Sequence, residues 1–305
     1  MNISRRTFIK NGSIAITGAA FLPASILDKP EKTDTILGIQ LWTVRDEMEK
    51  DPAGILKKLA KMGYRYVEHA GYQDRKFYGY TASEFKKLLN DLGLKMDSGH
   101  SFFGINAWDK TKKDFTDEWK YTVEDAAAVG MKYLISPGVE EVLCKNMDDF
   151  KWYMDFINKN GALCKKGGVT FGYHNEDYEF NHKLDDTVIY DLILQMTDKS
   201  LVCQQIDICN MYEFGGRAMD YLKRYPGRFL LMHVKDEVKR STPSKDGQIF
   251  ENTILGKGII GVKPLADFAR KTGTKYFIIE QESYQDKTPL ECAYEDLKVM
   301  QKWGY

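Results

Sequence analysis

The chain has 305 residues, of which 43% are hydrophobic and 29% are charged, a composition typical of soluble globular proteins. Its 44 basic residues balance its 44 acidic residues, so the formal net charge is zero. A general nucleic-acid binder usually carries a basic excess that neutralises phosphates. The charge balance therefore argues against DNA or RNA as a partner, and it leaves small ligands open.

The N-terminus resembles a twin-arginine export signal. Residues 4–10 read SRRTFIK, and residues 13–27 form an apolar segment rich in small residues, SIAITGAAFLPASIL. This segment is too short and glycine-broken to span a membrane stably, which takes about 20 apolar residues. We expect residues 1–30 to direct export to the periplasm and to be excluded from the fold. The alternative is a short amphipathic helix of the fold itself.

The five cysteines are scattered along the chain at positions 144, 164, 203, 209 and 292, and no two of them form a CxxC pair. An odd number without paired spacing argues against a zinc–thiolate site and against a disulfide framework. Cys203 and Cys209 lie in an apolar segment, which is typical of small core residues.

From Thr35 onward, short β-type segments alternate with amphipathic helical segments. The expected strands are 35–42, 64–70, 94–100, 131–138, 168–175, 201–209, 228–236 and 275–283. The expected helices are 51–63, 81–93, 117–130, 148–167, 184–197, 215–227, 262–273 and 289–304. Many of these helices close on glycine, as helix C-termini do. Eight strand–helix units predict a single-domain (β/α)8 barrel, or TIM barrel, over residues 34–305. A doubly wound sheet is the alternative, but its usual glycine-rich first turn is missing from IQLWTVRDE.

Polar side chains gather where the expected strands end, and in a barrel these ends meet at one mouth. Positions two apart share a face of a strand. The same-face pairs are therefore His174 with Glu176, Gln205 with Asp207, His233 with Lys235, and Glu280 with Glu282. A histidine, an aspartate, a histidine and a glutamate from four successive strands form a nitrogen and oxygen set that holds a divalent ion.

The segments GYHNEDYEF, QQIDICN, LLMHVKD and IIEQES, in this order, resemble the xylose isomerase-like superfamily of TIM barrels. They are most similar to its sugar phosphate isomerase/epimerase branch, which includes inosose dehydratase-like and 3-keto-sugar-processing proteins. The resemblance covers about Thr35 to Tyr305. It implies one divalent ion (Mn, Zn or Mg) with four ligands, namely His174, Asp207, His233 and Glu280.

The sequence departs from this family at one ligand position. Many relatives have a glutamate where this chain has His174, and there the glutamate also acts as a catalytic base. Glu176 could take that role here, or it could be the ligand in place of His174. This difference places simple aldose–ketose isomerisation in doubt. With histidine at this position, the segment GYHN resembles branch members that act on oxidised sugars.

The expected chemistry is proton abstraction beside the carbonyl of a sugar or keto-sugar, with a divalent ion as Lewis acid. The candidate bases are Glu176, Glu282 and His100, in that order. Lys235 could donate to a substrate oxygen or pair with Glu282. The expected substrate-binding residues are Trp42, Glu68, Phe102, Trp108 and Gln205, whereas Phe103 and Tyr173 are expected to pack in the core.

Return of the proton to another carbon isomerises, return to the opposite face epimerises, and loss of a β-substituent eliminates. The predicted function is a metal-dependent sugar isomerase/epimerase. The alternatives are a 3-keto-glycoside lyase or hydrolase, a dehydratase, and a non-catalytic sugar-binding barrel. An endonuclease IV-like repair enzyme needs three zinc ions and more than the five histidines present.

Two loops near the expected mouth have two interpretations each. Residues 255–261, LGKGIIG, could cradle a phosphate, but a simple connection into the seventh helix is favoured. The polar stretch 237–251 could be a lid over the site or a disordered insertion.

The export signal predicts the effect of a conservative double substitution. Replacing Arg5 and Arg6 with lysine keeps the charge but removes the paired arginines, so we expect the protein to stay in the cytoplasm with its leader attached. Cell fractionation and the mass of the accumulated protein measure this, and unchanged export of the double variant would rule out a twin-arginine signal.

Overall fold

The computed structural model describes residues 35–244 and 247–305, so the expected export signal lies outside the described residues. Eight parallel strands close a barrel in the order β1–β16–β13–β12–β9–β8–β5–β2. Their bounds are β1 Ile36–Gln40, β2 Tyr66–His69, β5 Lys95–His100, β8 Tyr133–Pro137, β9 Thr170–His174, β12 Val202–Asp207, β13 Phe229–Val234 and β16 Tyr276–Ile279. The predicted (β/α)8 barrel is confirmed.

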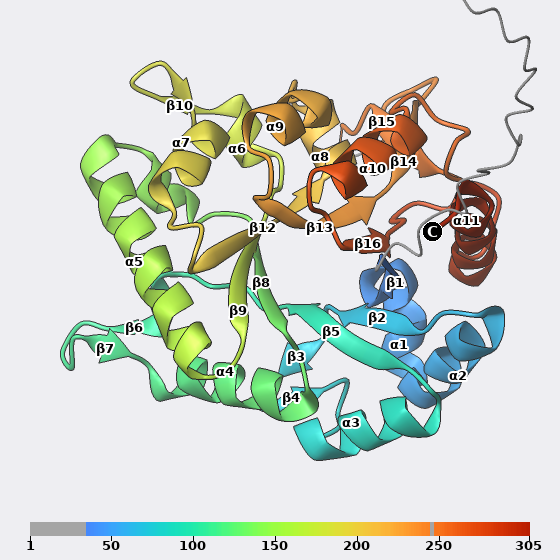
Figure 1. Ribbon diagram of the computed structural model, residues 1–305, viewed down its shortest axis with the longest axis horizontal. Coiled ribbons are helices and arrows are strands. Elements are labelled where there is room, and N and C mark those ends of the chain that lie inside the picture. The colour runs from blue at the N-terminus through green and yellow to red at the C-terminus, as the bar shows by residue number, and fades with distance from the viewer. Residues whose placement is uncertain (1–34, 245–246) are drawn as a thin grey trace, which may run out of the picture. The chain divides into compact units, whose positions relative to one another are not determined.

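Helices follow the barrel strands and surround the barrel (Figure 1). The helices that return the chain to the next strand are α2 Pro52–Met62, α3 Ala82–Asp91, α4 Asp117–Val129, α5 Met147–Lys166, α7 Ile189–Met196, α9 Ala218–Arg224, α10 Val262–Lys271 and α11 Pro289–Trp303. Three short helices, α1 Arg45–Lys50, α6 Tyr178–Asn181 and α8 Ile208–Glu213, lie within the connections. Gly63 and Gly130 end α2 and α4 with φ of 119° and 104°, a left-handed conformation that glycine adopts without a steric penalty.

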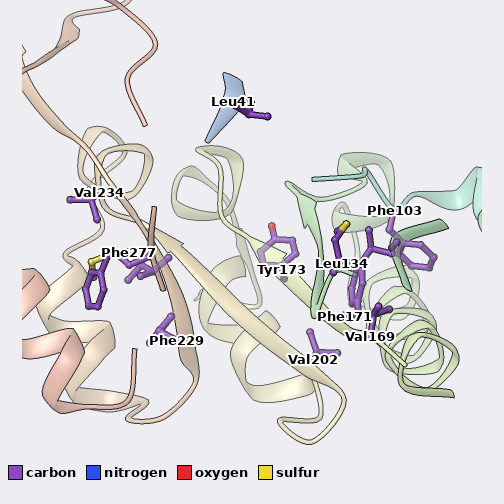
Figure 2. Packing of buried hydrophobic residues seen from close by; sticks show 14 of the residues in the cluster. Leu41, Phe103, Leu134, Val169, Phe171, Tyr173, Val202, Phe229, Val234 and Phe277 are labelled. Atoms are coloured by element: carbon purple, nitrogen blue, oxygen red, sulfur yellow. The ribbon is translucent and has the colours of Figure 1, made fainter. Parts of the chain in front are cut away.

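The barrel wall has different neighbours on its two faces. Residues on the outer face, such as Phe171, Leu134 and Phe277, pack in the core beneath the helices (Figure 2). Within the barrel, a separate apolar cluster contains Ile135, Cys203, Leu231, Tyr276 and Ile278. Side chains alternate along a strand, so Gln205, His233 and Glu280 are the next inward positions after Cys203, Leu231 and Ile278, and these polar residues lie at the floor of the mouth.

All five cysteines are buried and free, which agrees with the expectation from their spacing. Cys203 lies in the apolar cluster inside the barrel. Cys209, which follows the end of β12, is 1% exposed.

Four antiparallel hairpins, which the sequence pattern does not predict, project from the connections. They are β3 Tyr72–Gln73 with β4 Lys76–Phe77, β6 Trp108–Asp109 with β7 Asp114–Phe115, β10 Lys183–Leu184 with β11 Thr187–Val188, and β14 Asp236–Lys239 with β15 Phe250–Thr253. The helix expected over 184–197 therefore begins only at Ile189. Asp185 and Asp186 have φ of 46° and 63°, so they form a turn. Both ends of the stretch 237–251 belong to the hairpin β14–β15, with residues 237–239 in β14 and 250–251 in β15.

Among the described residues, the structure has no helix that is long and apolar enough to cross a membrane.

Candidate metal and substrate site

A cavity of about 480 Å³ opens at the carboxyl ends of the barrel strands, within the size range of small-molecule sites. Most of the residues predicted for the site line it. They are Trp42, His100, Phe102, His174, Glu176, Lys235, Glu280 and Glu282. Tyr72 and Asn210, which the sequence analysis did not single out, line it as well.

The four predicted metal ligands converge at the floor of this cavity. His174 Nε2 lies 3.8 Å from Asp207 Oδ2, and His233 Nδ1 lies 3.6 Å from the same oxygen. His233 Nδ1 also lies 2.8 Å from Glu280 Oε2. Asp207, His233 and Glu280 bring one ligand atom each within 4.8 Å of one another, and so do the three imidazoles of His100, His174 and His233.

The hydrogen bonds of Asp207 and His174 engage one polar atom of each side chain and turn the other toward the shared centre. Asp207 Oδ1 accepts the backbone N–H groups of Cys209 and Asn210 at 3.0 Å each, whereas its buried Oδ2 accepts no such bond and lies 2.9 Å from the ammonium group of Lys235. His174 Nδ1 bonds Gln205 at 2.9 Å, which leaves Nε2 facing Asp207. The donor set of two nitrogens and two oxygens fits a divalent ion and does not select sharply among Mn, Zn and Mg.

The ammonium group of Lys235 lies among the same carboxylates. Its Nζ is 2.9 Å from Asp207 Oδ2, 2.8 Å from Glu280 Oε2 and 2.5 Å from Glu282 Oε1. Burial alone would lower the pKa of Lys235, but these carboxylates outweigh it and raise the pKa well above its usual value. The lysine thus stays charged, and a divalent ion would compete with it for two of these oxygens. Lys235 pairs with Glu282, one of the two roles that the sequence left open.

Glu68 was predicted to bind substrate, but it lies buried beneath the cavity and does not line it. Its two carboxylate oxygens are occupied by partners from other barrel strands: Gln40 Nε2 at 2.8 Å, Ser98 Oγ at 2.5 Å, Gln205 Nε2 at 2.8 Å and His233 Nε2 at 2.6 Å. A carboxylate whose oxygens are filled in this way is a support for its neighbours and not a contact for a ligand.

The neighbour that Glu68 supports most directly is His233. Because His233 Nε2 bonds Glu68, Nδ1 is the nitrogen that faces Asp207 and Glu280. Burial would lower the pKa of His233, but the carboxylates of Glu280 and Glu68 outweigh it and raise the pKa well above its usual value. Nδ1 must release its proton to bind an ion, as every ligating imidazole does. A carboxylate on the far nitrogen is the usual partner of a metal-binding histidine.

Two further residues predicted to bind substrate lie elsewhere. Gln205 is fully buried and joins His100, His174 and Glu68 by hydrogen bonds of 2.6, 2.9 and 2.8 Å. Trp108 belongs to the hairpin β6–β7, where it packs edge-on against Phe115 and Phe156, and it does not line the mouth cavity. Phe103 and Tyr173 are each 1% exposed and pack in the core, as expected.

Glu176 follows β9 and turns its carboxylate into the cavity. Its side chain is 42% exposed, and Oε2 accepts a hydrogen bond from Asn210 Nδ2 at 2.8 Å. The surrounding protein desolvates this group, which raises the pKa of Glu176 well above its usual value. The other two candidate bases are engaged, because Glu282 pairs with Lys235 and His100 Nε2 bonds Gln205 at 2.6 Å.

The glycine-rich segment 255–261 wraps a carboxylate of its own chain. The backbone N–H groups of Gly256, Gly258 and Ile260 donate to Asp236 at 2.8, 3.0 and 3.2 Å. This supports the favoured interpretation as a connection into α10, since the amides that could cradle a phosphate hold Asp236.

Sequence reasoning missed Gln40, Ser98 and Asn210. The first two could have been found by the alternation rule, because Gln40 and Ser98 lie two positions before the expected mouth residues Trp42 and His100. Asn210 lies in α8, beyond the end of β12, where the rule does not apply.

The comparisons with known proteins agree with the barrel fold. The model of the xylose isomerase-like TIM barrel family matches residues 56–303, and the chain belongs to this family. It is 28% identical over 240 residues to an inosose dehydratase of Clostridium perfringens, covering 70% of this chain and 78% of the relative.

Two solved structures extend the comparison. A sugar phosphate isomerase/epimerase from Parabacteroides distasonis has 26% identity and a TM-score of 0.73, covering 88% of this chain and 98% of that one. The IolI protein with a bound zinc atom has 13% identity and a TM-score of 0.65, covering 88% and 97%. The latter likeness is one of fold alone.

The donor set predicts which substitutions remove the metal. Asp207→Ala and His233→Ala should each abolish metal binding, because each deletes a donor from the floor of the cavity. Lys235→Met is the matched comparison. This variant should retain metal, since it removes a charge that contacts the same oxygens but does not delete any of the four predicted ligands. Metal content measured by mass spectrometry on folded protein tests this, and stoichiometric metal in both ligand variants would refute the assignment.

The position of Glu68 predicts a weaker and indirect effect. Glu68→Gln keeps the shape but loses the negative charge that orients His233, and such changes typically cost about 10–100-fold in metal affinity. Titration calorimetry with Zn²⁺ or Mn²⁺ measures the loss. An unchanged affinity in a folded Glu68→Gln variant would show that His233 needs no such partner.

Proposed function

We propose that the protein is a divalent-metal-dependent enzyme that removes a proton beside the carbonyl of a sugar or keto-sugar, as sugar isomerases and epimerases do. One observation carries this proposal. The carboxylate of Glu176 faces the mouth cavity next to the donor set of His174, Asp207, His233 and Glu280. A base beside an ion site is the arrangement that proton abstraction requires.

When bound by these four residues, a divalent ion would polarise the substrate carbonyl as a Lewis acid. Glu176 takes the proton, and the hydrogen bond from Asn210 to Oε2 keeps its carboxylate aimed at the cavity. Glu68 and Gln205 hold the imidazoles of His233 and His174 in place from below. Trp42 and Phe102, which are 41% and 53% exposed at the cavity wall, offer ring faces for a sugar.

Elimination is the second candidate reaction, because a curated relative is an inosose dehydratase and Lys235 provides an ammonium group at the cavity wall. In this reaction Glu176 removes the proton and Lys235 donates a proton to the departing hydroxyl, which leaves as water. Mass spectrometry of the product separates the two reactions, since an isomer keeps the mass of the substrate and an eliminated product is lighter by one water.

The proposal predicts the behaviour of Glu176→Gln. Loss of a general base typically lowers the rate by 10²–10⁴-fold, so we expect a decrease of about that size with the metal retained. The measurement is exchange of the α-proton with deuterium from solvent, followed by NMR over a panel of sugars that includes 3-keto-glucosides. Asp177→Asn is the matched control, because it changes an exposed carboxylate that does not line the mouth cavity.

Three outcomes would contradict parts of this proposal. A nearly unchanged rate in Glu176→Gln would move the base to Glu282 or His100. Loss of the metal in that variant would make Glu176 a ligand and His174 the candidate base. Wild-type protein that binds the sugars but neither exchanges their α-proton nor converts them would be a sugar-binding barrel.

A further inference from the structure

A second cavity of about 610 Å³ adjoins the mouth cavity. The two share Tyr72, Ser101 and Phe102 as part of their walls. The second cavity lies between the hairpin β3–β4, the loop after β5 and the first turns of α4, and its far wall includes Arg75 and Tyr121. We call it the Phe102–Tyr121 cavity. It is within the size range of a small-molecule site, so it offers room for a group of its own.

Two aromatic side chains of this cavity are exposed. Phe102 is 53% exposed where the cavities meet, and Tyr121 is 41% exposed on α4. The guanidinium of Arg75 lies 4.2 Å from the centre of the Tyr121 ring. It is fixed there by Asp125, which accepts hydrogen bonds from Nε at 3.0 Å and Nη2 at 2.8 Å.

The charges in this cavity disfavour an anionic ligand. Arg75 is neutralised by Asp125 and lies 3.7 Å from Glu124, and Asp74 and Glu118 add acidic groups to the wall. A phosphate group would therefore meet net negative charge. The combination of exposed aromatic faces with fixed polar groups instead suits a neutral ring that is apolar on one face and polar at its edge.

We propose that the substrate is a glycoside with two rings, whose reacting sugar carries a carbonyl, as an oxidised ring carbon or a reducing end, and lies in the mouth cavity, and whose second ring lies in the Phe102–Tyr121 cavity. This inference rests on the proposed function, because it is the mouth cavity that fixes the position of the reacting sugar. A monosaccharide in the mouth cavity would leave Tyr121 in water. The second ring is a sugar or an aromatic aglycone. Each of these rings has a flat face that can pack on Phe102 and Tyr121.

The test measures binding of a panel of glycosides to the full-length, metal-loaded protein. The panel contains glucose, galactose and xylose, together with the methyl, phenyl and glucosyl glycosides of each in both anomers. Titration calorimetry measures the affinity of the protein for each of them. At least one phenyl or glucosyl glycoside should bind about tenfold or more tightly than its methyl counterpart. Tyr121→Ala should remove most of this gain and leave binding of the methyl glycoside unchanged.

The control is Tyr294→Ala, which deletes a similarly exposed tyrosine from α11 outside both cavities and should change neither affinity. A preference for phenyl identifies an aromatic aglycone, and a preference for glucosyl identifies a second sugar. Equal binding of one-ring and two-ring ligands, a gain that survives Tyr121→Ala, or binding of no panel member would overturn the inference.

Failure of the proposed function gives a different result. In that case neither the reducing sugars of the panel nor the 3-keto-glucosides undergo α-proton exchange, while a gain in affinity that depends on Tyr121 would still be measured. Exchange with one-ring sugars, without any gain from a second ring, would instead leave the proposed function intact and overturn only the two-ring substrate.

Discussion

The imidazole of His233 is held between two buried carboxylates at the centre of the barrel mouth, with Nε2 on Glu68 at 2.6 Å and Nδ1 on Glu280 at 2.8 Å. Glu68 in turn accepts hydrogen bonds from Gln40, Ser98 and Gln205. Each residue of this network comes from a different strand, so the network joins the barrel across its interior. Buried polar groups of this kind are stable only when their partners are all present. The residues of this network therefore depend on one another for their hydrogen bonds.

The charges at the mouth suit a bound cation. Asp207, Glu280 and Glu282 share the ammonium group of Lys235, while Glu68 shares the imidazole of His233 with Glu280. Carboxylates outnumber cationic groups here, and buried charges are costly unless they are paired or bound to a metal. A divalent ion on the donor set would restore the balance, and Lys235 would then be free to contact Glu282 or a substrate.

The barrel and its connections have separate tasks. The apolar cluster of Ile135, Cys203, Leu231, Tyr276 and Ile278 fills the inside of the barrel beneath the polar residues, and it gives the site a rigid base. The connections then shape the space above that base. The hairpin β3–β4 and the start of α4 add a second cavity, and the segment around Gly256 and Gly258 holds the carboxylate of Asp236 beside the site.

The repeating pattern of strands and helices was enough to predict the barrel, because the periodicity of apolar residues is local and each unit repeats the same signal. The convergence of His174, Asp207, His233 and Glu280 could be predicted too, since strand alternation and the common mouth of a barrel bring strand ends together. The sequence did not indicate the depth of each side chain. Glu68 and Gln205 have the same inward alternation as these four residues, but they are fully buried below the mouth cavity, where other side chains fill their hydrogen bonds.

Contacts between distant segments were decided only by the tertiary structure. The pairing of Lys235 with three carboxylates and the hydrogen bond from Asn210 to Glu176 join residues at the ends of different strands. The cavity between Phe102 and Tyr121 likewise joins the connection after β5 to the hairpin β3–β4. Hairpins such as β10–β11 interrupt the expected helical pattern, because turn residues and packing override the local preference for a helix. The sequence by itself thus determined the barrel and the chemical types at its mouth. Their depth, their partners and the extent of the cavity follow from how the eight strand–helix units pack together.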